Sequence, residues 1–528
     1  MDLIISNLRI AVERDGLEEY GKAASAKLKL SVPDLSVVKI LSKSLDATNE
    51  EQFFFLVSIV VRVPDSFANE EGFPLHAEAA RPGRTAAIPA ERPVIIGFGP
   101  AGMFAALELL DHGIKPLIFE RGKRIEERDL DILGFIRDRT LDPESNIQFG
   151  EGGAGSYSDG KLFSRINNSP YANRVLDTLI RFGAPGEIGY LRKPHLGTDV
   201  LRGIVRNIRN HILSRGGEIH YSSRLTDVLV SDGMVTGVVI NGAADYRAST
   251  LYLAVGHSAR DTFRMLHDKG VALEQKPISI GVRIEHPASV INLVRYGRKY
   301  QGFPGLGAAT YSFNHMNRKT GRGVTTFCMC PGGEIVNASS EYGLLVLNGM
   351  SYAARDSAFS NSALVVSCRT EDYPSAHPLA GLDFQAEIEG RAFESAGKGW
   401  NVPAQNLLDF IGGRVSAGIK VNSYKMGSVA VDLNAVLPKF VCEELLTAFA
   451  KWKMEAPLFV SEHAVLLSPE TRTSSPVRIT RNENYGSVTL KNLVPIGEGA
   501  GYAGGITSSA IDAIKAVERR MATTLAFS

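Results

Sequence analysis

The sequence predicts an α/β protein whose core domain is discontinuous, and three observations lead to this prediction. From Val94 onward, short apolar runs alternate with helical patterns, which is typical of a parallel sheet covered by helices. Between residues 276 and 471 the alternation gives way to strand-like runs and Gly/Pro turns without a repeat. It returns near the end of the chain, with an apolar run at 493–496 and a helical pattern from about 507. We therefore expect a core domain that is interrupted by a β-rich α+β insertion.

The first 63 residues predict a small α+β module, for which we expect a ferredoxin-like arrangement. Strand-like runs at 3–5, 37–41 and 53–61 accompany a helical pattern at about 20–29. Prolines then become frequent, which breaks helices and ladders and indicates a connector. The expected division is 1–63 for the N-terminal module, 64–92 for the connector, 93–275 and 472–528 for the two parts of the core, and 276–471 for the inserted substrate or cap domain.

The composition is that of an ordinary globular protein. Of the 528 residues, 44% are hydrophobic and 22% are charged, which argues against a disordered or fibrous chain. The formal net charge is +1, so no overall basic field attracts nucleic acid or an anionic membrane. The longest apolar stretch, at about 53–61, is too short to span a bilayer. The first residues lack a secretory signal, and four cysteines are too few for a disulfide scaffold, so we expect a cytoplasmic protein.

A glycine-rich turn follows the first apolar run of the core. Residues 94–96 lead into Gly97-Phe98-Gly99-Pro100-Ala101-Gly102, and a helical pattern covers 103–110. This is the G-x-G-x-x-G fingerprint in its strand-turn-helix context, and it predicts a Rossmann-like nucleotide-binding domain. Gly97 permits the tight turn, Gly99 lets the backbone approach a pyrophosphate, and Gly102 lets the helix pack closely on the strand. We expect the anion to face the free N–H groups of the helix, next to Pro100 and Ala101.

The next apolar run ends in an acidic residue. Residues 116–119 are followed by Glu120, about 20 residues beyond the glycines, where a carboxylate accepts hydrogen bonds from ribose hydroxyls. Glu120 therefore favours an adenosine ribose without a 2′-phosphate. Arg121 follows it directly and is included among the expected cofactor contacts.

A second glycine-rich segment, far downstream, points to FAD rather than NAD. In two-dinucleotide-binding flavoproteins, a strand ends in Gly-Asp or Gly-Glu whose carboxylate holds the ribitol, and the next helix N-terminus faces the flavin. The segment PIGEGAGYAGGI at 495–506 resembles that arrangement, and it predicts cofactor contacts at Gly497, Glu498, Gly504, Gly505 and Ile506. A glycine-rich helix entry without a ligand is the alternative. Gly256, after the apolar run at 251–255, is a further candidate, although an ordinary buried strand and turn explains it nearly as well.

With these segments located, the chain resembles the bacterial NAD(FAD)-utilising dehydrogenases, FAD-dependent proteins of the glutathione-reductase-like superfamily. The resemblance runs from about residue 93 to the C-terminus and includes FGEGGAG at 149–155, SDGKL at 158–162, GHSARD at 256–261, CMCPGG at 328–333 and NGMS at 348–351. It implies FAD binding and a redox role without naming a substrate. Similarity to the aminoacetone-oxidase-like flavoproteins is confined to the glycine motifs, because their Gly-Arg-Cys-Asn segment is missing here.

Several residues near these motifs are candidates for the flavin environment. The loop with Gly152, Gly153, Gly155 and Ser156 is short of side chains, so its amides suit the pyrophosphate or the isoalloxazine edge, with a plain turn as the alternative. Lys161 would place a positive charge near the flavin, with a solvated lysine at least as consistent with the pattern.

Catalytic residues are less clearly marked. Cys330, with Cys328, suggests a thiol that exchanges electrons with the flavin, although two residues of one strand are far apart for a bridge. His257 and His195 are candidate proton donors, against the commoner reading as structural histidines. Arg472 and Arg478 are candidates for holding an anion, with salt bridges as the alternative. We expect no metal site, because C-x-C lacks a second ligand pair.

The leading hypothesis is an FAD-dependent oxidoreductase that acts on a small organic substrate. NADH or NADPH is a possible reductant of the flavin, but the sequence contains no second G-x-G-x-x-G in a βαβ context that would bind either nucleotide. An alternative is a flavin-dependent RNA-modifying or RNA-binding protein that uses residues 1–63, with basic residues at Arg202, Arg206, Arg209 and Arg215. A third hypothesis treats FAD as a structural element of a binding protein. The sequence does not indicate the oligomeric state.

Overall fold

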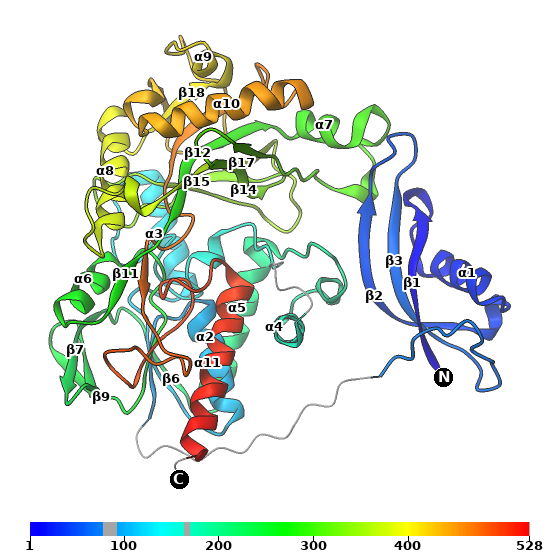
Figure 1. The fold of residues 1–528 in the computed structure, drawn as a ribbon, viewed down its shortest axis with the longest axis horizontal. Helices are drawn as coiled ribbons and strands as arrows, with labels where there is room; N and C mark the ends of the chain where they lie inside the picture. Colours follow the sequence, from blue (N-terminus) through cyan, green and yellow to red (C-terminus); the bar gives the residue numbers. More distant parts are fainter. Residues whose placement is uncertain (78–91, 163–168, 527–528) are drawn as a thin grey trace.

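The computed structural model describes residues 1–77, 92–162 and 169–526 (Figure 1). Part of the expected connector, residues 78–91, lies outside the described residues. The predicted α/β class is confirmed, since a parallel sheet with covering helices forms the core. Among the described residues, no helix combines the length and the apolar character needed to cross a membrane.

The core sheet has five parallel strands that come from distant parts of the chain. Its order is β22 (Leu493–Pro495), β10 (Leu251–Leu253), β4 (Val94–Ile96), β5 (Leu117–Phe119) and β6 (Glu218–His220). The C-terminal strand β22 therefore completes a sheet that begins some 400 residues earlier in the chain, which is roughly the separation of Val94 and Leu493.

Alternating side chains bury the two faces of this sheet against different layers. Ile95, Ile118 and Tyr252 pack on one face against four helices (Figure 1), which are α2 (Pro100–Asp111), α4 (Pro170–Arg181), α5 (Gly197–Ser214) and α11 (Ile506–Ala526). Val94 and Phe119 pack on the other face against a small sheet and a helix, which are β7 (Leu225–Ser231), β8 (Met234–Ile240), β9 (Ala244–Arg247) and α6 (Arg260–Asp268). The Asp232-Gly233 turn closes the β7–β8 hairpin with both residues at positive φ.

The β-rich region forms a separate layer above the core (Figure 1). Its seven-stranded sheet has the order β13 (Asn314–Asn317), β14 (Arg322–Cys330), β17 (Phe359–Cys368), β12 (Ile278–Pro287), β20 (Val465–Glu470), β18 (Val402–Asn406) and β19 (Ser428–Ala430). Its helices are α7 (Ala288–Tyr300), α8 (Ala380–Ser395), α9 (Leu407–Ile411) and α10 (Lys439–Glu455), and a hairpin pairs β15 (Glu334–Asn337) with β16 (Leu347–Met350). Helix α3 (Ile125–Asp138) of the core reaches this layer through Phe135, which packs edge-on against Trp400.

The chain enters and leaves the β-rich region side by side. Strand β11 (Leu273–Gln275) precedes that region and β21 (Val477–Ile479) follows it, and the two pair in antiparallel register. This pairing holds the β-rich region at a fixed place over the core.

The N-terminal module is a three-stranded antiparallel sheet with one helix. Its strands β1 (Asp2–Ala11), β2 (Ser36–Asp46) and β3 (Phe54–Arg62) lie in the order β1-β3-β2, and α1 (Leu17–Leu28) covers one face. The described residues therefore supply a βαββ unit, without the second helix and fourth strand of the ferredoxin-like arrangement that we expected. Residues 74–76 pair with the open edge of β1, so the start of the expected connector belongs to this module.

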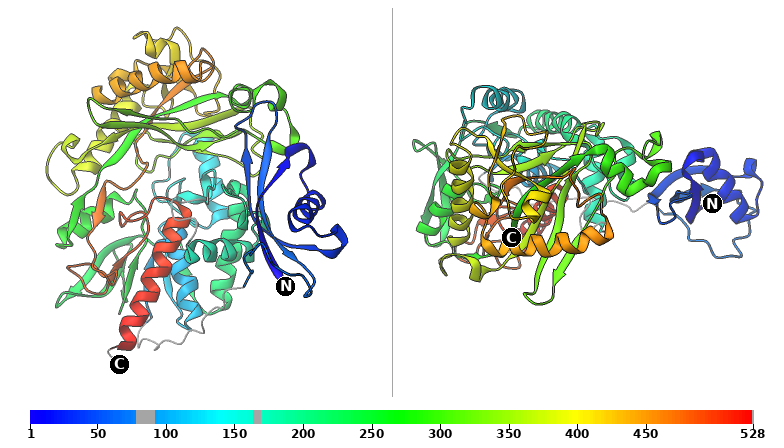
Figure 2. Two further views of the ribbon diagram at one scale, coloured as in Figure 1. Left: turned by 45° about the vertical axis from the view of Figure 1, so that its right-hand side comes forward. Right: turned by 90° about the horizontal axis from the view of Figure 1, so that it is seen from above.

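The N-terminal module contacts both other parts of the molecule (Figure 2). Phe53 stacks on Tyr300 of α7 at a centroid distance of 4.3 Å, and the Tyr300 hydroxyl donates to Glu13 at 2.6 Å. The backbone of Lys43 in β2 exchanges hydrogen bonds with Tyr190 and Arg192 of the core. The module is thus packed against the rest of the chain by an aromatic contact and by an edge of its sheet.

Candidate active site

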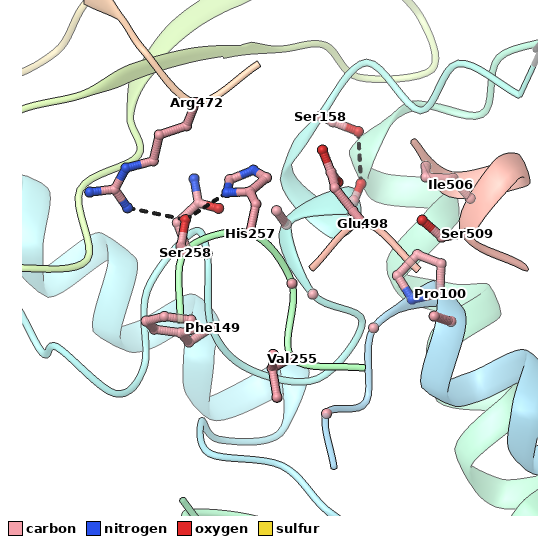
Figure 3. A pocket seen from close by; sticks show the side chains of 18 of the residues that line it. Pro100, Phe149, Ser158, Val255, His257, Ser258, Arg472, Glu498, Ile506 and Ser509 are labelled. Atoms are coloured by element: carbon pink, nitrogen blue, oxygen red, sulfur yellow. Dashed lines mark hydrogen bonds between the residues drawn. The ribbon is translucent and has the colours of Figure 1, made fainter. Parts of the chain in front are cut away.

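A cavity lies where the carboxyl ends of four core strands meet the β-rich layer. Gly97, Glu120, Gly256 and Glu498 follow β4, β5, β10 and β22 respectively, and all four line this cavity. Open α/β sheets bind their ligands at this edge, so the location is that of a ligand site. Figure 3 shows side chains from these segments directed toward a common space.

The glycine-rich turn leaves the cavity wall without a side chain at Gly97 and Gly99. Gly97 has φ +94°, and a Cβ there would lie 2.3 Å from the carbonyl oxygen of Ala254. A Cβ on Gly102 would lie 2.0 Å from the Gly97 carbonyl oxygen, so Gly102 serves helix packing and does not line the cavity. Helix α2 begins at Pro100, and no side chain caps its N-terminus. Its free amides and positive dipole end are therefore available to an anion.

Glu120 joins three backbone segments in addition to lining the cavity. Its carboxylate accepts hydrogen bonds from the amides of Phe98 at 2.7 Å, Gly122 at 2.9 Å and Gly150 at 3.0 Å. The sequence predicted only a contact with a ribose. The additional role is structural, because the carboxylate fixes the glycine-rich turn against the loop at 149–155.

Arg121 lines the cavity, but its charge is already paired. The guanidinium donates to Glu144 at 2.8 Å and to Asp261 at 3.0 Å, and it lies 4.0 Å above the centroid of the Phe149 ring. It therefore positions an aromatic wall of the cavity.

Of the four residues that we expected to contact the cofactor in the loop at 152–156, only two reach the cavity. Gly153 and Gly155 line it, whereas Gly152 and Ser156 lie behind it. A Cβ on Gly152 would be 2.0 Å from the Ser156 Oγ, so these two residues pack against each other. The Ser156 hydroxyl is buried and has no hydrogen-bond partner in the part of the chain that is described.

The C-terminal glycine segment presents a free carboxylate. Glu498 is half-buried and points into the space between His257 and Ile506 (Figure 3), and its carboxylate has no hydrogen-bond partner among residues 1–77, 92–162 and 169–526. Burial raises the pKa of Glu498 to about 7, and the nearby charge of Lys276 opposes the shift. The same wall of the cavity is lined by Gly504, Gly505 and Ile506, at the N-terminus of α11.

Gly497 has a packing role instead. It has φ +74°, its amide donates to Asp512 at 2.8 Å, and a Cβ there would lie 2.7 Å from the Ala101 side chain. It therefore lets the two glycine-rich segments approach each other behind the cavity.

His257 lines the cavity as a neutral imidazole. Its Nδ1 lies 2.9 Å from the Ser258 hydroxyl, and burial together with the Arg472 charge lowers its pKa to about 3. A proton donor with that pKa is deprotonated at neutral pH, which argues against the acid role considered for His257. His195 does not line the cavity, and it contacts the Ala353 carbonyl at 3.4 Å.

Arg472 is committed to a buried ion-pair cluster. Its Nε and Nη2 donate to Glu389 at 2.9 and 2.8 Å, and its Nη1 donates to Ser258 and Ser340. Arg260 binds the same Glu389 carboxylate. Although burial opposes it, the charges of Arg260 and Arg472 lower the pKa of Glu389 to about 2.

The two arginines considered as anion holders are therefore otherwise engaged. The donors of Arg472 are occupied by protein acceptors. Arg478 pairs with Glu274 at 2.9 Å and does not line the cavity.

Two cysteines from β14 line the end of the cavity nearest the β-rich layer. Cys330 is fully buried, and burial raises its pKa to about 12. Both are free thiols. A bulge with φ +44° at Cys328 leaves this residue exposed while Cys330 is buried, so the regular strand geometry that we assumed does not hold. Cys330 is protonated at neutral pH and its neighbour Cys328 lies on the exposed side of the strand, which argues against the thiol–flavin exchange considered for Cys330.

Lys161 lies at the same end of the cavity. Its ammonium contacts the Asp159 carboxylate at 2.7 Å and donates to the Met329 carbonyl. Lys161 is therefore held in place by an ion pair. Among the described residues, no group of three or more His, Cys, Asp or Glu is placed to hold a metal ion.

Comparison with known proteins identifies the chain. Residues 277–473 match the family profile described as "FAD-dependent protein, C-terminal domain-like". A protein of Clostridium beijerinckii that is described as uncharacterised is 42% identical over 530 residues, and the alignment covers 98% of each chain. The chain belongs to the same family as this Clostridium protein, and residues 277–473 belong to an FAD-dependent protein family.

Solved structures show weaker similarity to this FAD-dependent protein. Quinol-fumarate reductase with menaquinol is 14% identical, with 84% of this chain and 72% of that chain covered and a TM-score of 0.38. The 3-ketosteroid-Δ4-(5α)-dehydrogenase from Rhodococcus jostii RHA1 is 12% identical, with 83% and 96% covered and a TM-score of 0.35. At TM-scores below 0.5 we draw no argument from these similarities.

The residues that line the cavity suit FAD. Two facing glycine loops and the uncapped N-terminus of α2 leave backbone amides for a pyrophosphate, and the unpaired Glu498 carboxylate suits the hydroxyls of a ribitol chain. Of the residues expected to contact the cofactor, the cavity is lined by Gly97, Gly99, Pro100, Ala101, Glu120, Arg121, Gly153, Gly155, Gly256, Glu498, Gly504, Gly505 and Ile506. Gly102, Gly152, Ser156 and Gly497 lie behind it.

Sequence reasoning missed a set of cavity residues from outside the glycine motifs. These are Gln148, Ser223, Arg224, Thr262, Phe327, Glu470 and Thr473, together with Phe149, Asn348 and Gly349. The last three fall within the stretches that carry the family resemblance, which was a usable signal. The others have no local motif. Gln148, Ser223, Arg224 and Thr262 come from core loops and α6, whereas Phe327, Glu470 and Thr473 reach the cavity because the β-rich layer packs on the core.

Proposed function

We propose that this FAD-dependent protein is an oxidoreductase that oxidises or reduces a small organic substrate. The observation that carries the proposal is the extent of the cavity. It begins at the glycine-rich turn and Glu120, passes Glu498 and the N-terminus of α11, and continues to Phe327, Asn348 and Glu470 of the β-rich layer. FAD supplies hydride and electron transfer when it is bound. We expect the last part of the cavity to accept a second molecule beside the cofactor.

The protein contributes binding, orientation and exclusion of water. The amides of the glycine loops would bind the pyrophosphate, Glu120 the adenosine ribose, and Glu498 the ribitol. The β-rich layer, including β14 and β20, covers the cavity and would separate the reacting atoms from solvent.

We also propose a superfamily and a domain division for the chain. Residues 93–275 and 472–528 would form one glutathione-reductase-like nucleotide domain, with 276–471 as a substrate or cap domain. The parallel sheet shared by β4 and β22 supports this division. Four free cysteines support a reducing compartment such as the cytoplasm.

A flavin assay under anaerobic conditions tests the function. Purified protein loaded with FAD is titrated with NADH and, separately, with NADPH, and the flavin absorbance is followed. Bleaching by either nucleotide, followed by reoxidation with an added acceptor, supports an oxidoreductase. A flavin that light can reduce, but that neither nucleotide nor a panel of organic acids, alcohols and amines reduces, would instead favour FAD as a structural element.

The RNA-binding alternative lacks support. Three of the four basic residues that motivated it are paired, with Arg202 on Asp129 and Arg206 and Arg209 on Glu126. Neutralised arginines leave little positive charge for a phosphate backbone.

A further inference from the structure

The end of the cavity beneath the β-rich layer presents hydrogen-bond donors from two side chains, Lys161 and Asn348. Both line the cavity. Lys161 follows the glycine loop of the core, whereas Asn348 lies in β16. Neither belongs to the glycine segments that suit FAD, so these donors face the part of the cavity that is left for a second molecule.

The orientation of the Asn348 amide follows from its neighbours. Arg283 can only donate, and its Nη2 lies 2.9 Å from the Asn348 Oδ1, which also accepts from the Gly349 amide at 2.8 Å. The oxygen is therefore engaged on the protein side. The NH2 group has no acceptor among the described residues and is available to the cavity.

Lys161 also has a donor to spare. Its ammonium carries three N–H groups, of which one contacts Asp159 and one contacts the Met329 carbonyl. The third has no partner within the described ranges, 1–77, 92–162 and 169–526. The ion pair and the carbonyl hold the ammonium in a fixed position, so little conformational entropy is lost when a ligand binds there.

The ion pairs that surround Lys161 and Asn348 carry a net charge of one positive unit. Asp159 is shared between Lys161 and Arg355, which bonds it through Nη2 at 2.5 Å. The Glu470 carboxylate, which also lines the cavity, is paired with Arg283 at 2.9 Å. Three cations thus face two carboxylates. The neighbouring cluster of Arg260, Arg472, Glu341 and Glu389 is balanced, with two charges of each sign.

We propose that Lys161 and Asn348 bind the carboxylate of a small organic acid, which is the substrate class of the proposed oxidoreductase. Two donors and one surplus positive charge match a carboxylate, which is a monoanion with two acceptor oxygens. A phosphate, which carries more charge and three acceptor oxygens, would find too few donors. The side chain of Phe327 supplies an apolar contact for the body of the acid.

A pair of isosteric probes tests this inference on the FAD-loaded protein. Benzoate and benzamide have the same shape and differ in charge, and binding is followed as a perturbation of the flavin absorbance. We expect benzoate to bind at least tenfold more tightly than benzamide. Equal affinities for the two probes, or no perturbation by benzoate, would overturn the inference.

Two variants assign the site. Lys161→Met removes the ammonium and should weaken benzoate at least tenfold, with Lys161→Arg restoring part of the affinity. Asn348→Asp keeps the oxygen that Arg283 binds but replaces the free NH2 with a charged oxygen, so it should repel benzoate and weaken its binding more than that of uncharged benzamide. The exposed Lys420, which lies outside the cavity, gives the control Lys420→Met with unchanged binding. Wild-type affinity for benzoate in both Lys161→Met and Asn348→Asp would overturn the assignment.

The inference rests on the proposed function, yet the two fail separately. If the flavin is not reduced by any donor but benzoate still binds through Lys161, the carboxylate site stands and the oxidoreductase proposal falls. If NADH or NADPH reduces the flavin and benzoate binds no better than benzamide, the oxidoreductase proposal stands and the carboxylate site falls.

Discussion

Gly99 and Gly153 touch backbone to backbone, since a Cβ added to Gly153 would lie 3.1 Å from the Gly99 Cα. The two residues belong to loops about 50 positions apart in the sequence. The amide of Gly152 donates to the Phe98 carbonyl at 2.8 Å, which holds the loops in contact. The wall of the cavity is therefore assembled from both loops together.

Replacing Gly153 by alanine is expected to weaken FAD binding. Gly153 has φ +63°, where an L-residue costs roughly 1–2 kcal/mol, and the added methyl group would also push against the Gly99 loop. We expect a loss of about tenfold in FAD affinity, which corresponds to about 1.4 kcal/mol. The measurement is the FAD dissociation constant, by quenching of flavin fluorescence. Gly186→Ala is the matched control, because a Cβ at Gly186 meets no atom within 4 Å.

Glu389→Gln is expected to destabilise the fold strongly. The carboxylate is the shared acceptor of Arg260 and Arg472, and removing one partner of a buried ion pair costs about 3–5 kcal/mol. The free energy of unfolding in urea at pH 7 measures this loss. A variant that unfolds within 1 kcal/mol of wild type, roughly the effect of an exposed pair, would contradict the buried cluster.

The Glu389 carboxylate also makes the free energy of unfolding depend on pH in the acid range. Its pKa falls from the ordinary 4.5 to about 2 in the folded protein, so the unfolded chain takes up a proton first. The stabilisation is fully present above about pH 4.5 and is lost as the pH falls toward 2. Urea midpoints between pH 5 and pH 3 should therefore fall more steeply in wild type than in Glu389→Gln.

The sequence could indicate that Gly97, Gly99, Glu120 and Glu498 share one cavity because the determinants of their positions are local. Gly97, Gly99 and Glu498 each follow a strand directly, and their roles depend on the next few residues and on the helix that starts there. Glu120 was found by the same reasoning, since a fixed strand-helix-strand unit separates it from the glycines.

The remaining features depend on contacts between distant segments. No residue near Arg472 in the sequence indicates that its guanidinium will form an ion pair with Glu389. The bulge at Cys328 arises where β14 shifts register against β17, and this cannot be read from one strand alone. The pairing of residues 74–76 with β1 similarly required an open sheet edge that the sequence does not reveal.

The N-terminal module is expected to depend on Phe53 for its attachment. Phe53 is fully buried against Tyr300, so Phe53→Ala should lower the free energy of unfolding by about 3–5 kcal/mol, as truncation of a buried phenylalanine does. Tyr300→Phe keeps the stacking and removes only the hydroxyl, which donates to Glu13 and accepts from the Phe53 amide at 3.5 Å, so it should cost about 1 kcal/mol. Urea unfolding of both variants measures these losses. Equal losses in the two would show that stacking is not the main contact.

Glu498→Gln should separate stability from cofactor binding. In the FAD-free protein, burial raises the pKa of Glu498 from 4.5 to about 7, so the folded state holds a proton that the unfolded chain has released. The contribution of this group is therefore most favourable below about pH 4.5 and becomes unfavourable as the pH rises through 7. Glutamine does not titrate, and the FAD-free variant should gain stability over wild type at pH 8 but not at pH 4.

The same variant should bind FAD less tightly. Hydrogen bonds to a charged acceptor are stronger than those to a neutral one, so exchanging the carboxylate for an amide should cost about 1.4 kcal/mol, or tenfold in affinity. Urea unfolding of the FAD-free protein at pH 4 and pH 8 is compared with FAD titration at pH 8. A variant that is more stable at pH 8 and binds FAD more weakly would identify Glu498 as a carboxylate kept for the ligand at the expense of the fold. If instead FAD affinity is unchanged, the ribitol must be held by other groups.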